Sequence, residues 1–402
     1  MSKPNLLFIL TDQQRADSLA CYGNTHIQAP NLNRLAEESF VFENAYVSQP
    51  VCSPSRATLL TGTYPHTARV PACNIRLPEE IPTIAELVDD DYQCAWLGKW
   101  HLGDEIFAQR GFDEWVGSED SYRAHYSTAE RLDQLSDYHH FLIEQGLEPD
   151  RELLGQRVFS RHFEASLPEE LTKAAFLGER TADFIRNRGD QPFVAFVSYL
   201  EPHPPHTGPL NDLYDPATLP VGPHFLQKPE ANASVLNRVM AAYYMESEEY
   251  GFDLRTEAGW RAVRARYWGN VSLVDRSVGK ILAALEESGQ AENTIVVFTS
   301  DHGEMAGDHG ILGKCVLYEE SVRVPLLIRD PRRGSEQKLI PGNVSHIDLL
   351  PTLLDLMGQP IPAHLQGESR VAVLNGEHSL ADNDVFIEWN GRTAIPYPVK
   401  RR

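Results

Sequence analysis

The sequence is poor in three features, and each absence excludes a class of protein. It has five cysteines in 402 residues, an odd and sparse set that does not form a disulfide framework. It contains no apolar run long enough to span a bilayer. It has 36 basic against 57 acidic residues, and the net charge of −21 disfavours nucleic acid and anionic membranes as partners. An anionic small molecule stays open, because a local positive cluster can bind it.

The N-terminal segment lacks the pattern of a signal peptide. Met-Ser-Lys-Pro-Asn leads directly into an apolar run, without a charged segment followed by a cleavage site. As written, the chain is therefore expected in the cytoplasm. A chain trimmed of a leader would look the same, and its protein would be periplasmic or secreted.

Short apolar runs alternate with helical patterns along the chain. The runs at 6–10, 94–97, 193–200, 294–299 and 324–328 are interpreted as buried strands. Helices are expected over 30–38, 262–285 and 346–356, and another after a capping box at 166–169. This alternation predicts an α/β fold with a large, mostly parallel central sheet and helices on both faces.

Polar side chains follow four of the predicted strands. Asp12, Lys99, His203 and Asp301 each come shortly after a different apolar run. The carboxyl ends of parallel strands meet at one edge of a sheet, where α/β proteins place their sites. One such residue alone is more often part of a turn, but four together predict a functional site at this edge.

Cys52 begins the sharpest motif, Cys-Ser-Pro-Ser-Arg. Pro54 suits the first turn of a helix and Gly62 its end, which puts Cys52 at a helix N-terminus, where the free N–H groups favour an anion. Arg56 lies about one turn further on. By itself this pattern describes either a buried small residue or a reactive thiolate.

The motif at Cys52 resembles the signature of type I sulfatases in the alkaline phosphatase superfamily. The similarity continues through 57–62 (ATLLTG), 98–103 (GKWHLG), 300–303 (SDHG), 307–310 (GDHG) and Lys314. It covers roughly residues 4 to 358 in the order of the family. The resemblance implies an alkaline phosphatase/sulfatase-like fold and hydrolysis of a sulfate monoester.

In that family the cysteine is oxidised to formylglycine by a dedicated maturation enzyme, and a hydroxyl of the hydrated aldehyde is the nucleophile. The resemblance therefore implies formylglycine at Cys52 and one divalent metal, with these ligand positions: Asp12, Gln13, Cys52, Asp301 and His302. Many relatives have Asp at the position of Gln13 and Asn at that of His302. Gln13 as a neighbouring hydrogen-bond donor is the alternative to Gln13 as ligand. The set favours Ca²⁺, with Mn²⁺ and Mg²⁺ as alternatives.

The resemblance also implies roles for the cationic and imidazole side chains. Arg56 would hold the hydrated aldehyde, and Lys99 and Lys314 the sulfate oxygens. His101 would remove a proton from the second hydroxyl, so that the covalent intermediate collapses and the nucleophile is regenerated. His203 would act as general acid at the leaving oxygen, and His206 competes with it for this role. The expected substrate-binding residues are Asn74, Lys99, His203 and Lys314.

The chain is expected to divide into a catalytic domain at 1–365 and the start of a short or truncated C-terminal subdomain at 366–402. Residues 104–190 are expected as an insertion that lines the substrate pocket, and 384–389 as a strand of the subdomain. An edge left exposed by a short subdomain would favour a homo-oligomer.

Three functions remain open at this stage. The first is a sulfatase acting on a sulfated small molecule, and the insertion with the Gln13/His302 pair favours a saccharide over an aryl sulfate. The second is a phosphonate monoester or phosphodiester hydrolase of the same superfamily, although those relatives typically lack the pair formed by Lys99 and His101. The third is a non-catalytic protein that binds sulfated glycan, in which Cys52 would stay a thiol.

Overall fold

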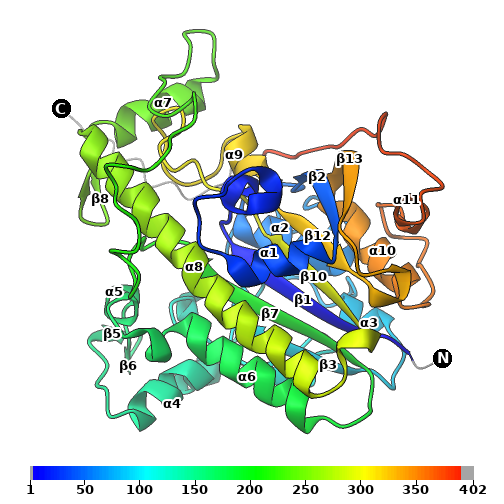
Figure 1. Ribbon diagram of the computed structural model, residues 1–402. Helices are drawn as coiled ribbons and strands as arrows, with labels where there is room; N and C mark the ends of the chain where they lie inside the picture. The colour runs from blue at the N-terminus through cyan, green and yellow to red at the C-terminus, as the bar shows by residue number, and fades with distance from the viewer. Residues whose placement is uncertain (1–2, 391–402) are drawn as a thin grey trace.

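A central sheet crosses the molecule from one side to the other (Figure 1). The computed structural model describes residues 3–390, and within them the sheet has nine strands in the order β11-β2-β12-β10-β1-β7-β3-β4, with β13 beside β2. Their bounds are β1 Asn5–Asp12, β2 Phe40–Tyr46, β3 Gln93–Gly98, β4 Glu114–Val116, β7 Phe193–Pro202, β10 Thr294–Ser300, β11 Arg323–Val324, β12 Leu326–Arg329 and β13 Lys338–Ser345.

Most neighbouring strands of this sheet run parallel. β10, β1, β7, β3 and β4 form one continuous parallel block. β12 is antiparallel to β10 and to β2, and β11 is antiparallel to β2, while β13 is parallel to β2. The predicted fold class, a mostly parallel central sheet with helices, is confirmed.

Helices cover the sheet on both faces (Figure 1). Their bounds are α1 Pro30–Glu37, α2 Cys52–Thr61, α3 Ile84–Leu87, α4 Asp137–Glu144, α5 Arg161–Ala165, α6 Lys173–Asn187, α7 Val235–Tyr244, α8 Glu257–Glu287, α9 Glu319–Val322, α10 Leu349–Leu356 and α11 Val371–Leu374. Two small antiparallel hairpins stand apart from the sheet, β5 Arg151–Leu153 with β6 Gln156–Val158, and β8 Glu248–Glu249 with β9 Phe252–Asp253. Among the described helices, none is both long and apolar enough to cross a membrane.

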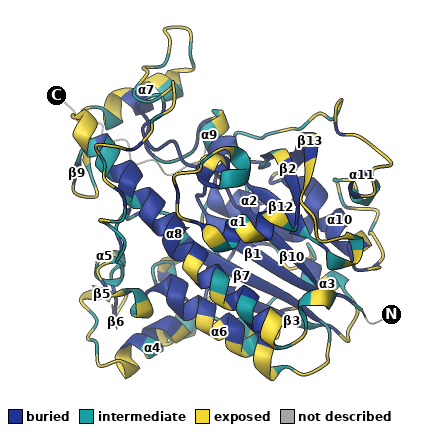
Figure 2. Cartoon of the chain, in the orientation of Figure 1, coloured by how far each residue is buried: buried dark blue, intermediate teal, exposed yellow. Residues whose placement is uncertain are grey.

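Two hydrophobic cores sandwich the sheet. Leu7 and Ile9 of β1 pack with α1, α6 and α8 on one face, whereas Leu6 and Phe8 pack with α2 and α10 on the other. Successive side chains of a strand point to opposite faces, so a strand between two helical layers is buried on both faces and apolar in its centre. All eight residues of β1 are buried for this reason, and Figure 2 shows the centre of the sheet as buried.

Three local predictions were wrong. The capping box at 166–169 does not start the long helix. A short 3-10 helix, Glu169–Leu171, follows it, and α6 begins only at Lys173, where the Thr172 hydroxyl accepts the Ala175 N–H at 3.2 Å as its cap. The run at 324–328 is divided by Pro325 into β11 and β12. Residues 384–389 form no strand, although the Glu388 N–H donates to the Ser48 carbonyl at 2.7 Å. The rest of the predicted C-terminal subdomain, 391–402, lies outside the described residues, and the division into two domains stays a prediction.

Candidate active site

The site forms where β1 and β10 end together beside the N-terminus of α2. The Asp301 N–H donates to the Thr11 carbonyl at 3.0 Å, and the Gln13 N–H donates to Asp301 Oδ1 at 3.1 Å. These bonds lock the residues that follow two parallel strands into one rim. All ten residues of α2 are buried, so its first residue, Cys52, is inserted into the rim.

Four potential metal ligands converge here. Asp12, Cys52, Asp301 and His302 offer ligand atoms that all lie within 4.8 Å of one another. His302 Nε2 is 3.2 Å from Cys52 Sγ, 3.6 Å from Asp12 Oδ1 and 3.5 Å from Asp301 Oδ1. Burial and the charge of Asp12 raise the pKa of Asp301 to about 6. Two buried carboxylates and one imidazole are a donor set that fits a divalent cation.

Gln13 turns its amide oxygen toward the same cluster. Its Nε2 donates to Glu304, which fixes the orientation of the amide, and its Oε1 accepts from Lys314 Nζ at 2.6 Å. Glu304 is fully buried and also accepts the Ala306 N–H at 2.8 Å. Gln13 therefore presents an oxygen that can serve as a ligand, and Glu304 holds it in place.

Arg56 bonds to both carboxylates of the cluster. Its Nε donates to Asp301 Oδ2 at 2.8 Å and its Nη2 to Asp12 Oδ2 at 3.2 Å. Its Nη1 donates to Ser198 Oγ at 2.7 Å and to the Lys99 carbonyl at 2.9 Å. The guanidinium thus fixes the position of the carboxylates, and the expected contact with a converted residue 52 stays a prediction.

Two lysines bring positive charge to Cys52. Lys99 Nζ donates to Asp12 Oδ2, and Lys314 Nζ lies 3.3 Å from Cys52 Sγ. Burial opposes charge on each lysine, but nearby anions, Asp12 above all for Lys99, raise the pKa of both ammonium groups. A hydrogen bond from Cys73 and the charges of Lys314 and Lys99 lower the pKa of the Cys52 thiol. Position 52 therefore lies in surroundings that favour an anion.

His101 is poised to accept a proton. Burial, followed by the charge of Lys99, lowers the pKa of His101 to about 4, so the imidazole is neutral near pH 7. Its Nε2 lies 2.8 Å from Asn74 Oδ1, which can only accept, so the proton is on Nε2 and the lone pair on Nδ1. Tyr122 stacks on the ring at 4.1 Å, and the Glu105 carboxylate accepts the His101 N–H at 2.7 Å.

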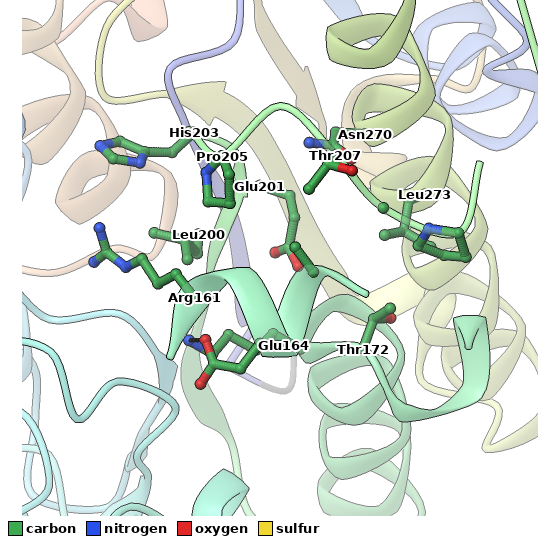
Figure 3. Close-up of a pocket in the computed structure, with 14 residues that line it drawn as sticks. Arg161, Glu164, Thr172, Leu200, Glu201, His203, Pro205, Thr207, Asn270 and Leu273 are labelled. Atoms are coloured by element: carbon green, nitrogen blue, oxygen red, sulfur yellow. Dashed lines mark hydrogen bonds and ion pairs between the residues drawn. The ribbon is translucent and has the colours of Figure 1, made fainter. Parts of the chain in front are cut away.

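His203 and His206 occupy different depths after β7. His206 is fully buried, and its Nε2 is 3.9 Å from Glu304 Oε2, whereas His203 is partly exposed. His203 lines a pocket together with Arg161 of α5, and Figure 3 shows both side chains at the same end of it. Burial and the charge of Lys314 lower the pKa of His203. Its partial exposure places His203, rather than His206, where a substrate can reach it.

The structure brings together all the side chains expected at the site and adds several that the sequence did not reveal. The residues that sequence patterns missed are Glu105, Tyr122, Arg161, Ser198 and Glu304. Glu304 and Glu105 had a weak signal, an acidic residue within four positions of a predicted site histidine. Tyr122 and Arg161 lie in the segment 104–190 that was expected to line the substrate pocket, but no pattern singled out either residue.

Comparisons with known proteins agree with this geometry. A family model described as Sulfatase matches residues 4–359. An uncharacterized sulfatase YidJ of Escherichia coli is 31% identical over 385 residues, which cover 93% of this chain and 71% of that protein. An N-acetylglucosamine-6-O-sulfatase of Bacteroides thetaiotaomicron is 28% identical over 432 residues and covers 93% of this chain and 71% of its own length.

A solved structure of the same architecture is similar over most of the chain. It is the phosphonate monoester hydrolase of Agrobacterium radiobacter, with a TM-score of 0.75, 26% identity, and coverage of 93% of this chain and 78% of that one. Such hydrolases are relatives within the superfamily. The family model and the sulfatase relatives span nearly the whole chain. The protein therefore belongs to the sulfatase family and is a sulfuric ester hydrolase, in a family that generally uses a metal ion and formylglycine.

Proposed function

We propose that the protein hydrolyses a sulfate monoester on a carbohydrate, with Cys52 converted to formylglycine beside one divalent cation. The observation that carries the proposal is the buried cluster of Asp12, Asp301 and His302 around Cys52 Sγ, with two lysines against it. A cluster of this charge and burial is costly unless it has a function.

The cation would be held by oxygens and an imidazole from three segments of the chain: Asp12 and Gln13, residue 52, and Asp301 and His302. When bound, it supplies Lewis-acid charge to the sulfate oxygens and lowers the pKa of a hydroxyl at residue 52. The oxygen donors suit Ca²⁺, Mn²⁺ and Mg²⁺ alike, and we place Ca²⁺ first with Mn²⁺ and Mg²⁺ as alternatives.

Residue 52 would supply the nucleophile as a hydrated aldehyde, and the chain positions it from three directions. The N-terminus of α2 favours negative charge at this point. Lys99 and Lys314 would bind the sulfate oxygens as fixed cations. Arg56 keeps the two carboxylates in register with residue 52 through bonds to both.

Two histidines would move protons. His101 would accept one at Nδ1, the nitrogen that its bond to Asn74 leaves free. His203 Nδ1 donates to the Pro204 carbonyl at 2.8 Å, so its Nε2 faces away from that bond. To act as general acid, His203 must carry a proton on Nε2. The negative charge of a bound sulfate ester raises the pKa of His203 and so favours this protonated form.

A saccharide is the substrate class that we favour. A relative named as an N-acetylglucosamine-6-O-sulfatase matches 93% of this chain, and the segment expected over the pocket contributes Tyr122 and Arg161 to the site. The similarity to a phosphonate monoester hydrolase keeps that activity as the second candidate. Lys99 and His101, both beside residue 52, favour sulfate.

The test is expression together with a formylglycine-generating maturation enzyme, followed by two measurements. Mass spectrometry of the peptide that spans Cys52 should show formylglycine, and an unmodified thiol there would favour a non-catalytic glycan-binding protein. Rates on nitrophenyl sulfate, a phosphate diester and a phosphonate ester should be highest for the sulfate. A panel of defined sulfated saccharides then identifies the sugar.

A chelator provides the test of the metal. Treatment with EDTA should abolish turnover, and adding back Ca²⁺, Mn²⁺ or Mg²⁺ separately should restore it to different extents. Turnover that is indifferent to the chelator would contradict the proposed metal site.

A further inference from the structure

The β8–β9 hairpin has an unfavourable residue at its tip. Two residues, Tyr250 with φ 52° and Gly251 with φ 82°, join the strands Glu248–Glu249 and Phe252–Asp253. Positive φ at both central positions is the geometry of a type I′ turn, which favours Asn, Asp or Gly at the first position. A bulky aromatic residue in the left-handed region is strained there. The turn itself therefore does not explain the tyrosine.

Packing does not explain the tyrosine either. The Tyr250 side chain remains 47% exposed, one of the large apolar side chains that the fold leaves in contact with water. Its neighbour Phe252, by contrast, is 6% exposed within a small core beneath the hairpin. A residue that is strained in its backbone and unburied in its side chain is a candidate for a functional role.

The position of Tyr250 suggests what that role is. Its ring lies edge-on to that of His206, with centroids 6.3 Å apart, and His206 lies against Glu304, which holds Gln13. Gln13 Oε1 in turn accepts from Lys314 Nζ at 2.6 Å. These contacts connect the exposed ring of Tyr250 to the lysine that is expected to bind the sulfate.

The hairpin projects next to the N-terminal end of α8, and Figure 2 shows much of its surface as exposed. Lys314 comes from the loop after β10, and a continuous series of contacts through His206, Glu304 and Gln13 joins it to the Tyr250 ring. Tyr250 is therefore an exposed ring beside the group of side chains that surrounds residue 52.

We propose that Tyr250 is a specificity-determining residue, whose exposed ring stacks on the apolar face of the sugar that carries the sulfate. The inference rests on the proposed function and adds to it the residue that recognises the sugar. The C–H face of a pyranose ring packs well on an aromatic face, and such contacts add to simple burial. The sulfate would reach inward to Lys314 while the sugar ring lies against Tyr250.

The decisive variant is Tyr250→Asn, because it should stabilise the turn while it removes the aromatic ring. Asn is favoured at this turn position, so the variant should unfold at a higher temperature than the wild type. Loss of the ring should raise KM for a sulfated monosaccharide by about five- to tenfold and change kcat by less than about twofold. Inhibition by inorganic sulfate, which needs no sugar contact, should be unchanged. A purely structural tyrosine would not give opposite signs for stability and KM.

Two further variants serve as controls. Tyr250→Phe keeps the ring and should keep the wild-type KM within about twofold. Leu154→Asn makes the same exchange at the tip of the β5–β6 hairpin, where Leu154 has φ 51° and is 50% exposed, and it calibrates the stabilising effect of the turn. If Tyr250→Phe loses as much affinity for the sulfated sugar as Tyr250→Asn does, the proposal that the ring stacks on the sugar is wrong.

Binding can be measured without turnover. In a Cys52→Ala background with the cation present, calorimetric titration with the same monosaccharide sulfate should show a weaker Kd for Tyr250→Asn by a similar factor. An unchanged KM and Kd in Tyr250→Asn would overturn the inference. If the wild type hydrolyses no sulfate ester at all, the proposed function fails, and this titration still decides the role of Tyr250.

Discussion

Charged side chains are buried at the carboxyl end of the central sheet and exposed at its amino end. At the carboxyl end, Asp12, Arg56, Lys99 and Asp301 are fully buried and bond to one another. At the amino end, Lys3 pairs with Asp89 and Asp91, and all three side chains are between 39% and 56% exposed. Exposed pairs contribute little to stability, whereas buried charges are costly unless every partner is present. Dense buried charge therefore marks the functional end of the sheet.

The largest effect is expected from removal of the proposed nucleophile, residue 52. Cys52→Ala should lower kcat by at least about a thousandfold, because no other group can replace the reacting atom. Circular dichroism should show an intact fold. Cys21→Ala, a cysteine away from the cluster, is the matched control and should keep full turnover. Retained turnover in Cys52→Ala would refute the nucleophile assignment.

The next effect comes from breaking the buried ion pairs. Arg56→Ala leaves Asp12 and Asp301 without their shared guanidinium and should destabilise the protein by about 3–5 kcal/mol in urea unfolding. Arg56→Lys keeps the positive charge but not the several N–H donors of the guanidinium. The stability of Arg56→Lys should therefore fall between that of the wild type and that of Arg56→Ala. A loss below about 1 kcal/mol for Arg56→Ala would mean that burial of charge does not distinguish the two ends of the sheet.

A third prediction concerns pH. Burial raises the pKa of Glu105 from 4.5 to about 7, although its carboxylate accepts the N–H groups of Trp100 and His101. The folded state thus binds this proton more tightly than the unfolded chain. The group favours folding below pH 4.5, and that contribution is lost as the pH rises toward 7.

Relative to Glu105→Gln, the wild type should therefore lose about 3 kcal/mol of stability between pH 4.5 and 8. Urea midpoints measured across this range give the difference. Glu79→Gln, at an exposed position, should keep the slope of the wild type. If the slope of Glu105→Gln equals that of the wild type, Glu105 does not titrate as described.

The smallest effect should come from the amino end of the sheet. Lys3→Ala removes both exposed ion pairs and should change stability far less than Arg56→Ala does, with kcat and KM unaffected. The difference should shrink further in 0.5 M salt, because exposed charges are screened. A loss comparable to that of Arg56→Ala would overturn the contrast between the two ends.

The sequence predicted the parts of the molecule that depend on local pattern. Asp12, Lys99 and Asp301 follow apolar runs, and parallel strands bring their ends together, so the rim could be expected from residue order alone. The helix at Cys52 had both a proline at its start and a glycine at its end. The predicted start of α6 was too early, because Thr172, and not Ser166, caps this helix.

Contacts between distant segments were beyond the reach of sequence patterns. Glu304 bonds to Gln13 across 291 positions, and Ser198 bonds to Arg56 across 142. Tyr122 reaches Lys99 and His101 from a segment without regular periodicity. Tyr250 is in a turn for which its residue type is unsuited, so local preference pointed away from its position.

The burial of α2 limits when Cys52 can be modified. Cys52 is 2% exposed at the start of a helix whose every residue is enclosed, between the sheet and α10. An enzyme that oxidises this cysteine needs the surrounding peptide in its own active site, which the finished fold does not permit. The proposed oxidation of Cys52 would therefore have to precede folding. A molecule that folded first would keep its thiol, and the active fraction of a preparation would be decided during synthesis.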